Sequence, residues 1–167
     1  MLTILFAKLL VLKKNLPGKP TLKFMKKNII LVTGGAGFIG SSLIKYLNSK
    51  NFNYKIISLD NYSTGSKSNH IKNKNIKYIR GNNKDIDKLL KSVKNKIKVI
   101  FHFGEFSRIF QSFTNYKRCF EYNIHHSSKV IEFAKDNKIK IIYSATSSNL
   151  GNNGKDENLS PYAWSKS

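Results

Sequence analysis

The sequence predicts an α/β protein built on a doubly wound parallel sheet, and three observations support this prediction. Short apolar runs alternate with longer stretches of helical periodicity, which is typical of consecutive βαβ units. The short runs, such as Ile29–Val32, are continuously apolar, as expected for strands buried on both faces. A glycine-rich turn, Thr33 to Gly40, follows the first run. Such a sheet binds its ligand at the carboxyl ends of the strands.

The expected elements follow one another from residue 28 onward. Each strand is a short run rich in Ile, Val, Phe or Tyr, and each helix is a longer stretch that mixes apolar and polar residues. The strands are expected at Ile29–Val32, Tyr54–Leu59, Ile76–Ile79, Val99–Phe103 and Ile139–Ser144. The helices are expected at Phe38–Ser49, Asp85–Val93 and Tyr116–Asp136, with a further helix that begins near Pro161. Since no repeat or low-complexity linker interrupts them, residues 26–167 are expected to form one domain.

The first 25 residues differ from the rest. Leu2–Leu12 is apolar but too short to span a bilayer, and it lacks the preceding basic residues of a secretory signal. Lysines, Pro17 and Pro20 then interrupt any helix, and Met25, a candidate initiator, stands directly before the first strand. We interpret residues 1–25 as a disordered or spurious extension, in preference to a membrane anchor or targeting peptide.

The composition is strongly basic. The 167 residues include 30 Lys plus Arg and 9 Asp plus Glu, a formal net charge of +21. The lysines are spread along the whole chain and no nucleic-acid module accompanies them, so a basic surface that attracts a diphosphate is favoured over nucleic-acid binding. Cys119 is the only cysteine, which excludes an internal disulfide and a thiolate metal site and suits the cytoplasm. His125 and His126 are adjacent on a helix and point in different directions, so no metal site is expected.

The glycine-rich turn has the spacing of a dinucleotide-binding site. Gly34, Gly37 and Gly40 allow a tight turn, a close approach of the pyrophosphate and close packing of helix on strand. Free amides at the start of the following helix favour the anion. Asp60 ends the second strand about 20 residues further on, where a carboxylate accepts hydrogen bonds from the adenosine ribose. Because an acid there repels a 2′-phosphate, the sequence favours NAD over NADP.

Five motifs in order resemble a known family. Besides the glycine-rich turn they are Asp60-Asn61 followed by Gly65, His102 at the end of a strand, Ser144-Ala145-Thr146 after the next, and Tyr162 with Lys166. Over about residues 27 to 167 the chain resembles the extended short-chain dehydrogenase/reductase family, which has a Rossmann fold. The nearest match is to its NAD-dependent epimerase/dehydratase group, which acts on nucleotide sugars.

The resemblance implies roles for particular residues. Tyr162 is expected to remove a proton from a sugar hydroxyl, Lys166 to favour its phenolate, and Thr146 to hydrogen-bond the reacting oxygen. The substrate is then a nucleotide sugar, and the full-length form is expected to be a homodimer. The resemblance also implies that NAD is bound by Gly34, Gly37, Phe38, Ile39, Gly40, Asp60, Asn61, Asn82, Phe103, Asn123 and Lys166.

The residues around these motifs bear on the reaction. Related dehydratases have Asp and Glu directly after the threonine, whereas this chain has Ser147 and Ser148, which favours epimerisation or carbonyl reduction over dehydration. Asn82 replaces the usual aspartate that contacts adenine, so base recognition is expected to be altered. Gly104-Glu105 stands where the family usually has a pair of small residues. Glu105 is expected near the nicotinamide face, where it is either a substrate contact or a structural residue.

The resemblance covers only the amino-terminal half of the family, before the carboxyl-terminal substrate domain. Lys166 is the penultimate residue, on a short helix with no following turns to hold it. Three hypotheses remain: the amino-terminal half of a nucleotide-sugar epimerase or a related reductase or dehydratase, inactive by itself; a non-catalytic NAD-binding module completed by another chain; and a basic protein associated with nucleic acid.

Overall fold

A computed structural model of the chain describes residues 27–50, 53–148 and 159–167. The predicted extension, residues 1–25, lies outside the described residues.

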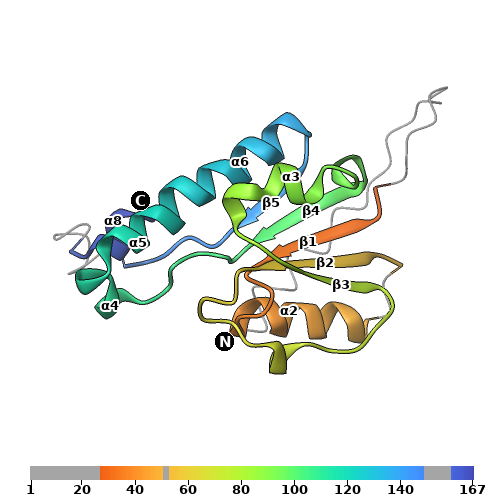
Figure 1. Cartoon of the computed structure of the whole chain (residues 1–167), viewed down its shortest axis with the longest axis horizontal. Helices are drawn as coiled ribbons and strands as arrows, with labels where there is room; N and C mark the ends of the chain where they lie inside the picture. The colour runs from red at the N-terminus through yellow and green to blue at the C-terminus, as the bar shows by residue number, and fades with distance from the viewer. Residues whose placement is uncertain (1–26, 51–52, 149–158) are drawn as a thin grey trace.

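The predicted parallel sheet is confirmed. Its strands run in the spatial order β3-β2-β1-β4-β5, and every neighbouring pair is parallel (Figure 1). The first strand is therefore central, and the chain winds outward from it in both directions, as a doubly wound fold requires. The bounds are β1 Ile29–Thr33, β2 Lys55–Asp60, β3 Ile76–Arg80, β4 Ile97–His102 and β5 Lys140–Tyr143.

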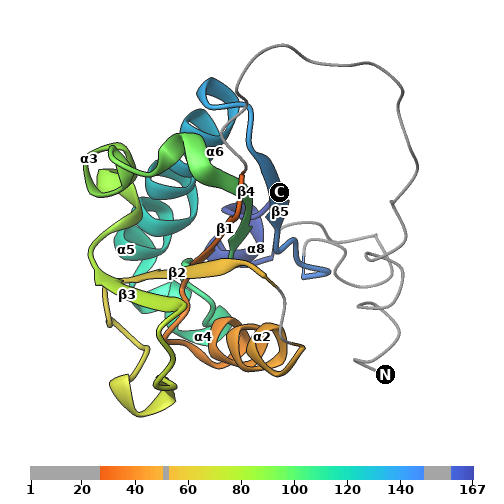
Figure 2. The same cartoon turned by 90° about the vertical axis from the view of Figure 1, so that its right-hand side faces the viewer.

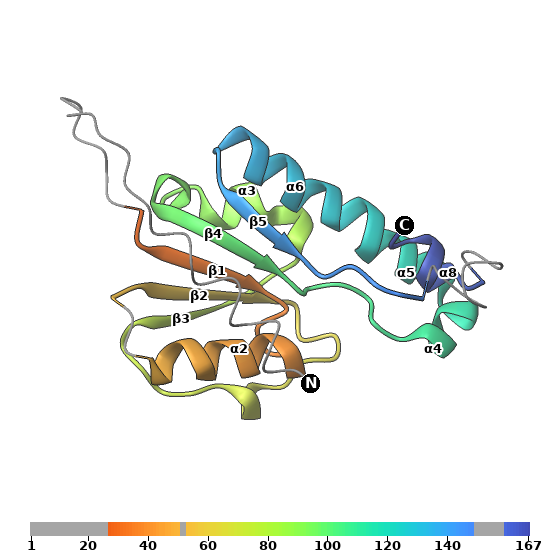
Figure 3. The ribbon, with the colours of Figure 1, turned by 180° about the vertical axis from the view of Figure 1, so that it is seen from behind.

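Helices cover both faces of the sheet. Helix α2 lies on one face, and α3, α5 and α6 lie on the other, as Figures 1 and 2 show from two directions. Helices α4 and α8 lie beyond the carboxyl ends of β1 and β4, which are seen from behind in Figure 3. The bounds are α2 Phe38–Ser49, α3 Ile86–Leu90, α4 Ile109–Thr114, α5 Tyr116–Phe120, a π-helical segment Glu121–His126, α6 Ser127–Asp136 and α8 Pro161–Trp164.

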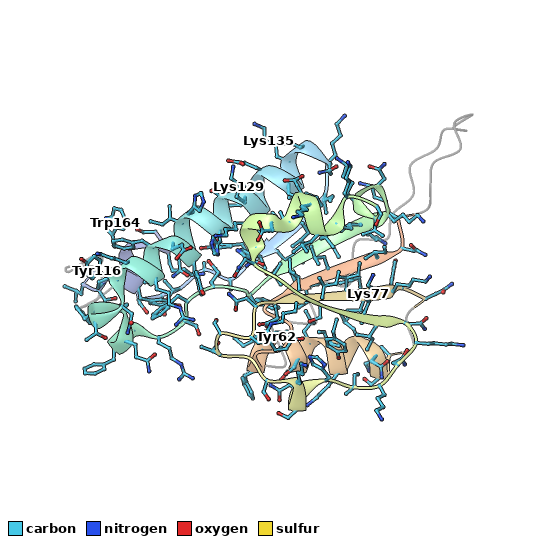
Figure 4. The ribbon with its side chains drawn as sticks, in the orientation of Figure 1. Tyr62, Lys77, Tyr116, Lys129, Lys135 and Trp164 are labelled. Carbon is cyan, nitrogen blue, oxygen red and sulfur yellow. The ribbon has the colours of Figure 1, made fainter. Side chains whose placement is uncertain are left out.

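Two apolar cores follow from the alternation of side chains along the central strand. Ile29 and Leu31 belong to the core beneath α3 and α6, and Ile30 and Val32 belong to the core beneath α2. Both faces of β1 are therefore buried, which explains why its sequence is continuously apolar. Lysines lie outside these cores, as Lys129 and Lys135 on the outer side of α6 illustrate (Figure 4).

The structure differs from the predicted helices in three places. The helix expected at Asp85–Val93 is shortened to α3, since the chain must turn through a 3-10 segment at Lys94–Lys96 to enter β4. The long helix Tyr116–Asp136 is present but contains the π-helical segment Glu121–His126. Helix α4 was not predicted, because its six residues are too few for a helical period to stand out.

Candidate functional site

A cavity of about 590 Å³ lies at the carboxyl ends of the strands, where the fold predicts a ligand site. It is bounded by the loops after β1, β2, β4 and β5 and by α8. The structure thus brings together residues from both ends of the described chain. The predicted site residues that line it are Gly34, Gly37, Phe38, Ile39, Gly40, Asp60, Asn61, Phe103, Tyr162 and Lys166.

The three glycines of the turn have different surroundings. Gly34 has a φ of 69°, and a Cβ there would lie 2.6 Å from the carbonyl oxygen of Phe103. A Cβ on Gly40 would lie 2.2 Å from the carbonyl oxygen of Gly34, so this glycine lets α2 pack against the turn. A Cβ on Gly37 would meet only that same oxygen, at 3.3 Å. Gly37 lines the cavity and has only this one close neighbour, so a ligand can approach its backbone.

The amino terminus of α2 also faces the cavity. Among the described residues, the backbone amides of Phe38 and Ile39 have no hydrogen-bond partner. The two residues are 83% and 58% exposed, so neither side chain is packed over the turn. Free amides and the positive end of a helix dipole favour an anionic group such as a pyrophosphate. The glycine-rich turn therefore fits the group that the sequence predicted for it.

Asp60 is held in place by the backbone around it. Its Oδ2 accepts a hydrogen bond from the amide of Ala36 at 2.9 Å, and its Oδ1 accepts one from the amide of Tyr62 at 2.7 Å. The first of these bonds ties the end of β2 to the glycine-rich turn. Each carboxylate oxygen has a second lone pair available for a ligand hydroxyl, so the structural bonds leave room for the predicted ribose contact.

Helix α8 is anchored more firmly than its length suggests. Its amino end is capped by Ser160, and the amide of Tyr162 donates to Ser112 Oγ at 3.2 Å. At its other end Ser165 Oγ accepts from Asn123 Nδ2 at 2.9 Å. Lys166 has no following turns to hold it, as expected, but α8 is held by other contacts. Side chains of α4 and of the π-helical segment hold α8 in place, although no further turns of α8 follow.

Lys166 forms an ion pair that the sequence did not predict. Its Nζ binds Glu105 Oε2, and both side chains are only 3% exposed. Ser144 Oγ donates to the same carboxylate oxygen at 3.0 Å, and Ser127 Oγ lies 3.3 Å from Oε1. Glu105 thus places an acid in the cavity. The serines after Thr146 therefore do not leave the cavity without an acid.

Burial and the same carboxylate act on the phenol of Tyr143. Burial, followed by the charge of Glu105 and a hydrogen bond to it, raises the pKa of Tyr143 well above its ordinary value. Lys166 Nζ lies 4.3 Å from the centroid of the Tyr143 ring. Tyr143 therefore stays protonated at neutral pH and helps to enclose the Lys166 ammonium.

Three predicted site residues do not line the cavity. Asn82 lies in an adjoining smaller cavity. Asn123 is buried, and its Oδ1 accepts a hydrogen bond from the amide of Phe106 at 2.7 Å. Asn123 therefore holds two partners in place, the loop after β4 and Ser165. Thr146 Oγ1 lies 3.0 Å from Ser148 Oγ and accepts from the Ser148 amide at 3.1 Å. Thr146 therefore hydrogen-bonds to neighbouring groups of its own turn, as Ser and Thr side chains outside helices and strands commonly do.

Several cavity residues were missed by the sequence analysis. Next to Glu105, which was expected near the nicotinamide face, the loop after β4 contributes Phe106, Ser107 and Arg108. The π-helical segment contributes Tyr122 and His126. The only signal for the loop was its position after a predicted strand, where loops of this fold meet the ligand. Within the described ranges there is no group of three His, Cys, Asp or Glu residues able to hold a metal ion, and no helix long and apolar enough to cross a membrane.

Comparison with protein families gives a match over most of the chain. Residues 30–167 match the model of the NAD dependent epimerase/dehydratase family. The chain is 33% identical over 148 residues to the ADP-L-glycero-D-manno-heptose-6-epimerase of Brachyspira hyodysenteriae, covering 83% of this chain and 46% of that protein. It is 38% identical over 124 residues to the dTDP-D-glucose 4,6-dehydratase of Dictyostelium discoideum, covering 70% and 28% of the two chains.

Solved structures give the same result. The UDP-glucose 4-epimerase of Thermotoga maritima, solved with UDP-glucose, superposes with a TM-score of 0.72 at 28% identity, covering 83% of this chain and 47% of that one. The UDP-N-acetylglucosamine 4-epimerase of Methanobrevibacter ruminantium superposes with a TM-score of 0.72 at 31% identity, covering 85% and 48%. The chain spans about half the length, or less, of these relatives.

Proposed function

The chain belongs to the NAD-dependent epimerase/dehydratase family, and on this premise we propose that it is the cofactor-binding half of a nucleotide-sugar epimerase that resembles UDP-glucose 4-epimerase. One observation carries the proposal. A single cavity contains both the glycine-rich turn with Asp60 and the pair Tyr162 and Lys166. Cofactor and substrate groups can therefore meet within it.

NAD is the cofactor of this family, and the described residues fit it. The α2 amides and Gly37 would bind the pyrophosphate, and Asp60 the adenosine ribose. The negative charge of Asp60 repels a 2′-phosphate and so favours NAD over NADP. When bound, NAD supplies the acceptor, and later the donor, of a hydride at a sugar carbon.

The residues of the chain handle the proton of the same sugar carbon. In the proposed reaction the Tyr162 side-chain oxygen takes the proton from the sugar hydroxyl as that carbon is oxidised, and it returns the proton when the carbon is reduced. The buried ion pair with Glu105 holds Lys166 in the cavity that Tyr162 also lines. Thr146 remains the candidate for a hydrogen bond to the reacting oxygen.

A second candidate function is dehydration of a nucleotide sugar. Elimination of water needs an acid or base besides the tyrosine, and Glu105 is a carboxylate in the same cavity. The serines after Thr146 favour epimerisation, because they cannot serve as that acid. Product analysis separates the two reactions, since an epimerase returns a sugar of unchanged composition and a dehydratase releases a keto-deoxy sugar.

The test uses two proteins. The first is the 167-residue chain, in which calorimetric titration should show binding of NAD in preference to NADP. The second is a fusion of this chain to the carboxyl-terminal half of a homologous epimerase, assayed for interconversion of UDP-glucose and UDP-galactose. Tyr162→Phe in the fusion should lower turnover at least about a hundredfold and leave NAD affinity nearly unchanged. Normal turnover in that variant would remove Tyr162 from the mechanism.

The 167-residue chain by itself should not turn over the nucleotide sugar. It spans about half of its relatives, and a reacting group displaced by about 1 Å can lose about a hundredfold in rate. Equal rates for the chain and the fusion would show that these residues are sufficient for catalysis.

A further inference from the structure

A second, smaller cavity of about 300 Å³ adjoins the first at the ends of β2 and β3. The two cavities share Asn61, Ser63, Gly81 and Tyr122. The residues that line the smaller cavity are Asn61, Ser63, Arg80, Gly81, Asn82 and Tyr122.

Hydrogen bonds fix the orientation of two amide side chains in this cavity. The backbone amide of Ser63 donates to Asn61 Oδ1 at 2.9 Å, so the NH₂ group of Asn61 must point the other way. That group donates to Asn82 Oδ1 at 2.9 Å. Because the Asn82 oxygen faces Asn61, its NH₂ group faces the cavity. Within the described part of the chain, this NH₂ group has no hydrogen-bond partner, and Asn82 does not cap the 3-10 segment that follows it.

The position of the cavity relates it to the base of a dinucleotide. The inference rests on the proposed function, in which the pyrophosphate lies at the amino terminus of α2 and the adenosine ribose lies at Asp60. A base attached to that ribose would enter the smaller cavity, which shares Asn61 with the first. Asn61 directly follows Asp60, so the amide pair lies where the edge of the base arrives.

An amide oriented in this way differs from a carboxylate in the bases it can recognise. A carboxylate only accepts hydrogen bonds, so it favours the 6-amino group of adenine and repels a 6-oxo group. The outward NH₂ group of Asn82 donates, either to a ring nitrogen of adenine or to the oxygen of a 6-oxopurine. It has no reason to reject the 6-oxo base.

We propose that Asn82, oriented by the bond from Ser63 through Asn61, makes the base end of this site a hydrogen-bond donor that accepts a 6-oxopurine dinucleotide about as well as NAD. The amide pair is thus a specificity determinant that relaxes the discrimination between adenine and 6-oxopurine bases.

The test is a calorimetric titration of the 167-residue chain with NAD and with nicotinamide hypoxanthine dinucleotide, which differs from NAD only in carrying a 6-oxopurine. The two dissociation constants should agree within about threefold. Asn82→Asp should create a preference for NAD of at least about tenfold, the size expected for a hydrogen bond to a charged group.

A second variant tests the orientation without changing residue 82. Asn61→Asp still accepts from the Ser63 amide, but its other oxygen requires a donor, which turns the Asn82 NH₂ group inward and its oxygen outward. The preference should shift toward NAD by about fivefold. Asn95→Asp, an exposed change of the same charge far from the cavity, should leave the ratio unchanged.

The outcomes separate the inference from the function beneath it. A preference for NAD of tenfold or more in the unaltered chain, or an Asn61→Asp variant whose ratio does not move, would overturn the inference and leave the NAD site intact. Failure of the chain to bind either dinucleotide would overturn the proposed cofactor site and the inference with it.

Discussion

Acidification should destabilise the fold through His102. This histidine ends β4 and is fully buried between the sheet and the π-helical segment with α6. Its Nδ1 lies 2.6 Å from Thr33 Oγ1, and its Nε2 lies 2.9 Å from Ser127 Oγ. Both ring nitrogens are thus engaged inside the protein, so a change in protonation must change a hydrogen bond.

The partners of Thr33 determine which nitrogen carries the proton. Thr33 Oγ1 accepts hydrogen bonds from the amides of Phe103 at 3.2 Å and Gly104 at 3.1 Å. With both lone pairs used, its hydroxyl must donate to His102 Nδ1. The imidazole is therefore neutral, with its proton on Nε2 and directed at Ser127. A second proton on Nδ1 would face the hydroxyl hydrogen of Thr33 and remove this bond.

The sign and size of the stability loss follow from the shift in the pKa of His102. Burial lowers the pKa of His102 from 6.5 to about 4; the charge of Glu105 raises it in part, and the charge of Lys166 lowers it further. Between these two values the unfolded chain binds a proton that the folded chain does not bind. The contribution is fully present above about pH 6.5 and is lost as the pH falls toward 4. At about 1.4 kcal/mol per pH unit, the loss is about 3 kcal/mol.

Urea unfolding between pH 7.5 and 4 measures this loss. His102→Gln keeps a donor for Ser127 but does not titrate, so its free energy of unfolding should depend less on pH, by about 3 kcal/mol across the window. His126 is the matched control, because burial also lowers its pKa and His126→Gln should leave the His102 component in place. Parallel loss of stability in the wild type and His102→Gln would show that His102 is not held neutral.

Four further predictions concern the turn and the cavity. Gly34→Ala should cost at least about 2 kcal/mol in denaturant unfolding, because of its positive φ and the Phe103 oxygen, whereas Gly37→Ala should cost less than about 0.5. Gly37→Val should abolish NAD binding in calorimetry by filling the space for the pyrophosphate. Glu105→Ala should cost about 3 kcal/mol by leaving the buried Lys166 unpaired, and adding Lys166→Met should recover most of it; additive losses would contradict the pairing. In the fusion, Thr146→Ala should slow turnover less than Tyr162→Phe; an equal loss would make the two residues one unit.

The parts of the fold that depend on local pattern could be predicted from the sequence. Helix α2 has the bounds expected from its periodicity, and β1 differs by one residue at its end. The glycine-rich turn and Asp60 were found because their spacing reflects one local βαβ unit. These predictions need no knowledge of what packs against the unit.

The features missed by the sequence analysis depend on contacts between distant residues. Glu105 and Lys166 are 61 residues apart, in a loop and a short helix that no periodicity relates. The anchoring of α8 depends on Ser112 and Asn123, polar residues whose partners appear only in the folded chain. The orientation of Asn82 is set by a backbone amide of the loop after β2. A linear sequence specifies the groups but not which of them will meet.

The central position of β1 has a consequence for how the chain is made. Its end pairs with the end of β4, since Thr33 is in register with His102, 69 residues further along. At about 5–20 residues per second, a ribosome would need roughly 3 to 14 seconds to add that stretch. During this interval the edge of β1 that later pairs with β4 has no partner. The strand itself is apolar on both faces. Newly made chains are therefore most vulnerable to aggregation before β4 emerges, and a chaperone that shields β1 would be most useful then.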